Sequence, residues 1–150
     1  MLTGDGSFEG GARAVHSFAV KEAGIEAEQI IAVDGSGLSK SNRTSAGALV
    51  GLLQYVAASD NWDVFLSTLP EAGRSLRRMY GTRAARNLRA KTGTIDGVSA
   101  LTGVVKTQDG ETLLFSILSN ELRSTGAAKR VEDRIGARLA EFRRQLTPTS

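Results

Sequence analysis

Residues 88–119 read LRAKTGTIDGVSALTGVVKTQDGETLLFSILS, and their pattern predicts the central sheet of the fold. Its side chains follow a period of two rather than 3.6, which is the periodicity of β-strands. Three strands are predicted, at residues 88–94, 98–106 and 112–119. Gly97 separates the first two strands, and Gln108-Asp109-Gly110 separates the last two, where Asp-Gly between β-branched runs is a strong hairpin signal. We therefore expect a three-stranded antiparallel meander.

Helical periodicity is found on both sides of this stretch. Apolar residues recur at spacings of three and four in three segments before it, residues 10–24, 44–58 and 62–69. Thr44 or Ser45 can cap the second of these helices, and Pro70 follows the third. Three helices are therefore predicted before the meander.

A fourth helix is predicted after the strands, beginning at Ser124 or Thr125. Its apolar residues form one stripe, which we expect to lie on a face of the sheet. The stripe consists of Val131, Ile135, Leu139 and Phe142. The fold class is therefore α+β, a three-stranded antiparallel meander with flanking helices, and residues 1–145 form its ordered part. Residues 146–150, LTPTS, are expected to fray.

The composition describes an ordinary globular chain and excludes several classes of protein. The chain has 150 residues, of which 41% are hydrophobic, enough for the core of a single domain. Cysteine is absent, which excludes disulfides, thiolate metal sites and thiol nucleophiles, and the one histidine, His16, cannot form a multi-histidine site. We expect no metal and no cofactor. No apolar run reaches the roughly 18 residues of a transmembrane segment, and the chain as given has no export signal.

Positive charge is most dense in the segment before the strands. The net charge is +3, and six arginines lie between residues 74 and 89: Arg74, Arg77, Arg78, Arg83, Arg86 and Arg89. Tyr80 is the only aromatic residue among them, so platforms on which bases could stack are scarce. We expect a solvated arginine-rich surface and do not favour nucleic acid as a partner. A small basic module that binds a polyanion stays open as an alternative.

Lys91, Thr92, Gly93 and Thr94 lie on the first predicted strand and could form a site that handles negative charge. A lysine ammonium stabilises negative charge, threonine hydroxyls can bind a carboxylate, and glycine leaves room for close approach. If the strand lies at an edge of the sheet, its free backbone N–H groups can pair with an extended peptide or bind a developing oxyanion. Alternation puts Lys91 and Gly93 on one face and Thr92 and Thr94 on the other.

Three segments follow one another along the chain: DGSGLSK at residues 34–40, LPEAG at residues 69–73 and RAKTGTIDGVSAL at residues 89–101. Together they resemble the C-terminal part of a penicillin-binding protein, and more closely the class C, low-molecular-mass D-alanyl-D-alanine carboxypeptidases of peptidase family S13. The resemblance implies the C-terminal portion of a transpeptidase-like domain with the serine β-lactamase-like fold. It also implies a serine-type hydrolase that forms an acyl-enzyme.

The same resemblance assigns roles to individual residues. Lys91 is similar to the electrostatic lysine of the family's Lys-Thr-Gly motif, which Thr92 and Gly93 complete. The hydroxyls of Thr92 and Thr94 would hold the terminal D-alanine carboxylate, and the Thr94 N–H would be one oxyanion donor. These four residues are therefore the candidate catalytic residues.

A loop is predicted between the first two helices. Residues 28–33 form a short apolar run that leads into a turn-rich stretch without periodicity. By resemblance this loop forms one wall of the cleft, so Gly37, Leu38 and Lys40 are candidates for contact with substrate. Many relatives have arginine where this chain has Lys40, and lysine lacks the bidentate fork of arginine.

The nucleophile of such an enzyme is missing from this sequence. Serine enzymes of the superfamily use a Ser-x-x-Lys pair, and no serine here has lysine three residues later. Ser59-Asp60-Asn61 spells the second motif, but in the family that motif precedes the DGSGLS loop, so we interpret these residues as a helix end. We therefore expect a C-terminal half that is inactive alone and pairs with a missing N-terminal half. A non-catalytic partner half of a separate chain is an alternative.

For the complete enzyme the resemblance implies a peptidoglycan stem peptide ending in D-Ala-D-Ala as substrate and β-lactams as ligands. It implies a cell-wall location outside the cytoplasmic membrane. Without the strands that precede the nucleophile in the family, residues 112–119 would present an uncovered apolar edge. We therefore expect the chain to form a homodimer or a larger species.

Overall fold

The computed structural model describes residues 6–144, in two compact units that divide after Trp62. The elements of the first unit are α1 (Phe8–Lys21), the 3-10 helix η1 (Ala27–Gln29), β1 (Ile30–Ile31), β2 (Arg43–Thr44) and α2 (Ala46–Ala57). β1 pairs antiparallel with β2, which the sequence did not indicate because each strand has only two residues. The core of this unit is Ala19, Ile25, Ile30 and Ala48.

Serine side chains fix where α1 and α2 begin. Ser7 Oγ accepts a hydrogen bond from the Gly10 N–H at 3.0 Å, so α1 begins two residues before the predicted helix. Ser45 Oγ accepts from the Ala48 N–H at 2.9 Å, which confirms one of the two predicted caps of α2. Gly24, with a φ of 67°, forms the left-handed turn after α1.

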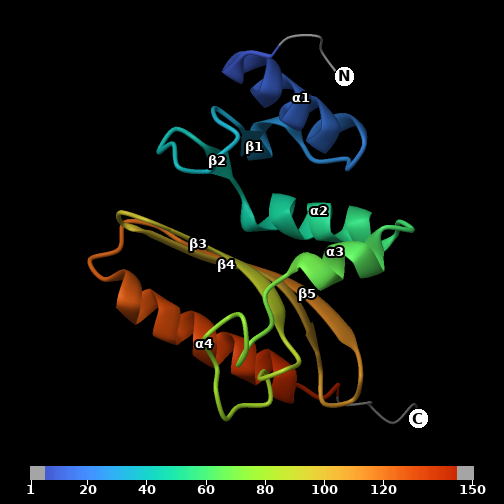
Figure 1. The fold of residues 1–150 in the computed structure, drawn as a ribbon, viewed down its shortest axis with the longest axis vertical. Coiled ribbons are helices and arrows are strands. Elements are labelled where there is room, and N and C mark those ends of the chain that lie inside the picture. Colours follow the sequence, from blue (N-terminus) through green and yellow to red (C-terminus); the bar gives the residue numbers. More distant parts are fainter. Residues whose placement is uncertain (1–5, 145–150) are drawn as a thin grey trace, which may run out of the picture. The chain divides into compact units, whose positions relative to one another are not determined.

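The second unit contains the predicted antiparallel meander with a helix across one face (Figure 1). After α3 (Trp62–Thr68), its strands are β3 (Arg89–Ile95), β4 (Val98–Lys106) and β5 (Thr112–Ser119), in the order β3-β4-β5. The predicted bounds of β4 and β5 are confirmed, and β3 is shifted by one residue. α4 (Thr125–Glu141) begins after its cap Ser124 and packs against β4 and β5. The α+β class is confirmed.

The face of α4 that packs on the sheet is not the predicted apolar stripe. Its buried residues are Ala128, Glu132, Gly136 and Ala140. Val131, Ile135 and Phe142 are 44%, 38% and 44% exposed, and only Leu139 of the stripe packs against the core. Small residues occupy the buried face because they let α4 approach the neighbouring side chains closely. A Cβ at Gly136 would lie only 2.9 Å from Leu88 Cδ1. The prediction of the buried stripe is therefore wrong.

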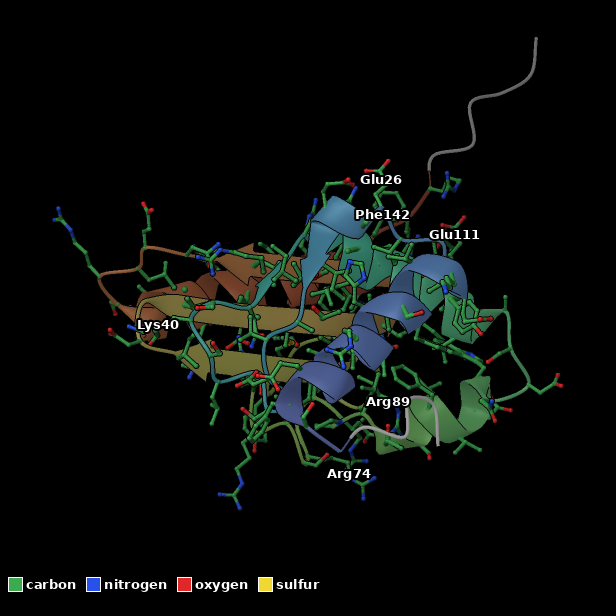
Figure 2. The ribbon with its side chains drawn as sticks, turned by 90° about the horizontal axis from the view of Figure 1, so that it is seen from above. Glu26, Lys40, Arg74, Arg89, Glu111 and Phe142 are labelled. Atoms are coloured by element: carbon green, nitrogen blue, oxygen red, sulfur yellow. The ribbon has the colours of Figure 1, made fainter. Side chains whose placement is uncertain are left out.

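Arg78 and Arg89, expected on a solvated surface, are instead paired with carboxylates. Arg78 Nη2 donates to Glu132 Oε2 at 2.8 Å, and the Arg78 side chain is only 14% exposed. Arg89 Nη2 donates to Glu71 Oε2 at 2.5 Å, and Arg74 lies 3.5 Å from the other oxygen of that carboxylate (Figure 2). Folding brings these acids near the arginines, so the prediction of a solvated arginine-rich surface is wrong for Arg78 and Arg89.

The hairpin between β4 and β5 is tied to the end of α4. Arg144 donates its backbone N–H to Asp109 Oδ2 at 2.9 Å and its Nε to Glu111 Oε1 at 2.6 Å. The Gln108 N–H donates to the Phe142 carbonyl at 3.0 Å, and Glu111 and Phe142 lie near one another in Figure 2. The hydrogen bond with Glu111 raises the pKa of Arg144 above its usual value. The sheet and the helix are therefore joined at this end.

Residues 6–144 contain neither a membrane-spanning helix nor a cluster of metal ligands. None of the helices among them is long and apolar enough to cross a membrane. In the same part of the chain, no three histidine, cysteine, aspartate or glutamate side chains cluster closely enough to hold a metal ion. The tail predicted to fray, residues 146–150, lies outside the described residues.

Candidate active site

The four candidate catalytic residues lie side by side on β3. Lys91 pairs with Thr102 of β4, and Thr94 pairs with Ser99. Lys91 and Thr94 are exposed, whereas Thr92 and Gly93 are half-buried. The strand therefore offers an ammonium, two hydroxyls and a glycine within four consecutive residues.

Backbone hydrogen bonds show which groups of β3 point away from β4. The Ala90 N–H donates to the Pro70 carbonyl at 3.0 Å, outside the sheet, so the Ala90 N–H points outward. Because successive N–H groups of a strand alternate in direction, those of Thr92 and Thr94 also point outward. Within residues 6–144, no strand pairs with β3 at these two positions. β3 is thus an edge strand whose start is covered and whose middle is open. An open edge is what pairing with an extended peptide requires.

Lys91 and Gly93 share one face of this edge. Lys91 Nζ donates to the Thr92 carbonyl at 2.5 Å, which holds the ammonium beside the strand. A Cβ at Gly93 would touch only Ala100 Cβ, at 3.4 Å, so the sheet itself does not require glycine there. At Gly103 of β4, by contrast, a Cβ would lie 2.1 Å from the Arg89 carbonyl oxygen. Glycine is a requirement of the fold at position 103, whereas at position 93 it keeps the open surface clear.

A buried polar network lies behind Thr94. Ser99, its partner across the sheet, is fully buried and donates its hydroxyl to Glu132 Oε1 at 2.6 Å. Glu132 is 1% exposed, and Arg78 binds its other carboxylate oxygen. Sequence reasoning missed this network, and no local pattern could have found it, because Arg78 and Glu132 are 54 residues apart.

A shallow pocket of about 500 Å³ adjoins Thr94 at the end of β3. Its walls are the β3–β4 turn, residues 95–97, and the segment before α4, residues 122–125. The Leu122 N–H donates to the Gly97 carbonyl at 3.0 Å and ties the two walls together. The open part of β3 therefore continues into a recess.

The predicted loop of the first unit is ordered by the carboxylate of Asp34. That carboxylate accepts hydrogen bonds from Asn42 Nδ2 at 2.7 Å, from the Ser36 hydroxyl at 2.8 Å, and from the Gly37 and Ser39 N–H groups. These bonds, that from Asn42 foremost, lower the pKa of Asp34 from 3.8 to about 2. Asn42 Oδ1 accepts from the Val33 N–H at 2.8 Å and closes the loop.

The loop displays the candidate substrate-contacting residues outward. Gly37 has a φ of 75°, a left-handed conformation that glycine adopts without strain. Leu38 is 69% exposed, and Lys40 is exposed on the same loop (Figure 2). The predicted site residues therefore fall into two groups, four on β3 in the second unit and three on this loop in the first.

Ser59-Asp60-Asn61 lies where the sequence interpretation put it, in the turn after α2. The Ser59 hydroxyl donates to the Val56 carbonyl at 2.8 Å and accepts from the Asn61 N–H at 3.3 Å. These bonds close the end of a helix.

Known proteins that are similar to this chain are D-Ala-D-Ala carboxypeptidases. Residues 1–142 match the model of the D-Ala-D-Ala carboxypeptidase 3 (S13) family. The chain is 37% identical, over 153 aligned residues, to the D-alanyl-D-alanine carboxypeptidase of Actinomadura sp. (strain R39), an alignment that covers 97% of this chain and 28% of that enzyme. The chain thus spans less than a third of that relative's length.

Solved structures agree with this placement. The crystal structure of penicillin binding protein 4 from Haemophilus influenzae matches with a TM-score of 0.78 and 28% identity, covering 91% of this chain and 34% of that one. The TLA-1 extended spectrum β-lactamase matches with a TM-score of 0.59 at 22% identity, over 86% of this chain and 52% of that one. The serine β-lactamase-like fold is therefore confirmed.

Proposed function

The chain belongs to the D-Ala-D-Ala carboxypeptidase 3 (S13) family, and we propose that it forms the β3 side of the active site of a penicillin-binding, serine-type D-Ala-D-Ala carboxypeptidase. The substrate is a peptidoglycan stem peptide ending in D-Ala-D-Ala. In the complete enzyme a serine oxygen attacks the carbonyl of the penultimate D-alanine. The C–N bond breaks, the last D-alanine leaves, and water then releases the acyl group from the serine.

One observation carries this proposal: the open edge of β3 at Thr92 and Thr94. An extended peptide can pair with the outward backbone groups of these residues, as peptides do when they add a strand to a sheet edge. The scissile carbonyl then lies against the Thr94 N–H, which stabilises the oxyanion that forms during attack. The second oxyanion donor is the N–H of the attacking serine.

The side chains around this edge complement the charge of a peptide end. The hydroxyls of Thr92 and Thr94 bind the terminal carboxylate, and the Lys91 ammonium supplies positive charge on the neighbouring face. Gly93 leaves the edge unobstructed, because its missing side chain would stand on the open surface. We also propose that Gly37, Leu38 and Lys40 of the first unit contact the substrate.

Acylation requires polypeptide that residues 1–150 do not contain. No Ser-x-x-Lys pair is present in them, so the nucleophile comes from an N-terminal half of the same transpeptidase-like domain, to which residues 1–145 contribute the C-terminal half. We also place the complete enzyme outside the cytoplasmic membrane, where peptidoglycan lies, and infer that it binds β-lactams.

A chimera tests this proposal directly. Residues 6–142 replace the matched segment of Haemophilus influenzae penicillin binding protein 4, and acylation by a fluorescent penicillin is measured. We expect the chimera to be labelled, and Lys91→Ala to slow labelling by about a hundredfold or more, as loss of an oxyanion-stabilising group does. Lys106→Ala, at the exposed end of β4, is the matched control and should label at the parent rate. Equal rates for the two variants would show that Lys91 is incidental.

The polyanion-binding alternative gains no support from the arginine-rich segment. Arg78 forms an ion pair with Glu132, and Arg89 forms one with Glu71. Fewer guanidinium groups are therefore left for phosphate contacts than the sequence suggested.

A further inference from the structure

The buried Glu132 carboxylate is bound on both of its oxygens. The Ser99 hydroxyl donates to Oε1 at 2.6 Å, and Arg78 Nη2 donates to Oε2 at 2.8 Å. Glu132 and Ser99 are fully buried, and all three residues lie within the second unit. Polypeptide added outside this unit therefore leaves their contacts in place.

Stability alone does not explain this buried ion pair. The free energy lost when a carboxylate and a guanidinium leave water is close to what their attraction contributes, and apolar side chains of similar size often replace such a pair without loss. A charge-assisted hydrogen bond differs from apolar packing in being short and directional, so it holds its partners at one distance and angle. The pair is therefore suited to fixing the position of Ser99.

Three acceptors on α4 hold the Arg78 guanidinium in one orientation. Besides Glu132, these are the Lys129 carbonyl, which accepts from Nη2 at 2.8 Å, and Asp133 Oδ1, which accepts from Nε at 2.7 Å. The next residue, Met79, is buried and has a φ of 61°, a left-handed conformation that is uncommon outside glycine. Such strain persists only where the surrounding structure enforces it. The chain thus holds a strained residue at the point where Arg78 enters the network.

Ser99 connects the network to the edge of the sheet. It lies opposite Thr94 in the ladder between β3 and β4, so the two side chains are on the same face. Because the Thr94 N–H points away from β4, this pair has no ladder hydrogen bonds of its own, and the Cα atoms of such pairs approach to about 4.5 Å. The two backbones are closest here, so a shift of Ser99 moves Thr94 with it.

We propose that Glu132 is a positioning residue for the oxyanion site: together with Arg78 it fixes Ser99, and Ser99 in turn fixes the Thr94 N–H. This inference rests on the proposed function, in which that N–H is an oxyanion donor. Such a donor acts at about 2.7–3.1 Å from the oxyanion, and a misplacement of about 1 Å can slow a reaction about a hundredfold. Glu132 lies on α4 beneath the sheet and acts only through Ser99.

The test replaces the network by apolar residues in the chimera described above. Arg78→Met, Ser99→Ala and Glu132→Leu are combined in one triple variant. Reaction with a fluorescent penicillin over a range of concentrations separates the acylation rate constant from the dissociation constant of the preceding complex. We expect the acylation rate constant to fall by between about tenfold and a hundredfold. The dissociation constant should stay at the parent value, because the side chains of Lys91 and Thr92 are unchanged.

Two controls separate this effect from a loss of stability. Arg138→Met with Glu141→Leu removes an exposed ion pair of α4 and should label at the parent rate. Leu139→Ala removes an apolar side chain packed against the core, so it should lower Tm and leave the acylation rate constant of the folded chimera unchanged. If the triple variant does not melt cooperatively, Ser99→Ala alone decides. It removes only the hydroxyl bound to Glu132 and should slow acylation about threefold or more, the effect of one lost hydrogen bond.

A measurement on residues 1–150 distinguishes failure of this inference from failure of the proposed function. The NMR order parameter of the Thr94 N–H reports how firmly β3 holds that group, whatever the chain catalyses. We expect it to fall in the triple variant, or in Ser99→Ala if that variant decides, and to keep its parent value in Leu139→Ala. An unchanged order parameter overturns the inference.

The Lys91→Ala chimera completes the comparison. If it is slow while the folded triple variant acylates at the parent rate, the positioning role is overturned and the proposed function stands. If Lys91→Ala itself labels at the parent rate, the proposed function fails, and the order parameter decides whether Glu132 holds Thr94 in place.

Discussion

Replacing Arg78 with methionine should destabilise the chain more than any change to its exposed ion pairs. The Glu132 carboxylate would stay buried, at 1% exposure, with only the Ser99 hydroxyl to compensate its charge. Breaking a buried pair on one side costs about 3–5 kcal/mol, because the remaining charge has lost its partner inside the protein. For a chain of this size each kcal/mol lowers Tm by about 2–4 °C, so Tm should fall by roughly 6–20 °C.

The assay is urea and thermal unfolding of Arg78→Met, followed by circular dichroism. Arg138→Met is the matched control on α4, because Arg138 is 85% exposed and lies 3.5 Å from Glu141, a geometry worth less than about 1 kcal/mol. Combining Arg78→Met with Glu132→Leu and Ser99→Ala should recover most of the loss, since no buried charge or hydroxyl is then left unpaired. A loss below about 1 kcal/mol for Arg78→Met alone would refute the reasoning.

Three further predictions concern the edge strand, the loop and the nucleophile. Gly93→Ala should leave the unfolding free energy of the chain nearly unchanged but slow acylation of the chimera. Gly103→Ala should lower the unfolding free energy, because its Cβ meets backbone atoms. Equal losses of unfolding free energy in the two variants would contradict this prediction. The depressed pKa of Asp34 means that its hydrogen bonds favour the folded loop at pH values above 3.8, and that this contribution is lost as the pH falls toward 2. Amide resonances of Gly37 should report that titration by NMR and should not do so in Asp34→Asn. The chain alone should take no covalent label from a fluorescent penicillin, and mass spectrometry showing stoichiometric labelling of any serine would disprove the missing-nucleophile argument.

The strands and caps of this chain were predictable because their causes are local. Period-two alternation and the Asp109-Gly110 turn specify β4 and β5, and Ser45 specifies where α2 begins. The buried face of α4 was not predictable, because Leu88 and Met79, which precede β3, lie too close to Gly136 for a side chain there. That face depends on the distance between elements, which a single sequence does not report.

The candidate site shows the same division. The residues of the Lys-Thr-Gly motif could be named from their order along the chain, and the loop at residues 34–42 could be recognised by its small and polar residues. The Arg78–Glu132–Ser99 network could not, since its members come from three segments that meet only in the folded protein. The outward direction of the Thr94 N–H likewise follows from the hydrogen bond between the Ala90 N–H and the Pro70 carbonyl. The periodicity of the sequence does not indicate that bond.

The covered start of β3 limits how many residues of another strand can pair with its open edge. Pro70 and Ala72 already pair beside Ala90, so an incoming strand finds outward groups only at Thr92 and Thr94 before it meets polypeptide. Two residues of the incoming strand can pair, and a strand that continues past them toward Ala90 meets backbone groups that already have partners. The open edge of β3 is therefore bounded at one end, and pairing on it stops at Thr92.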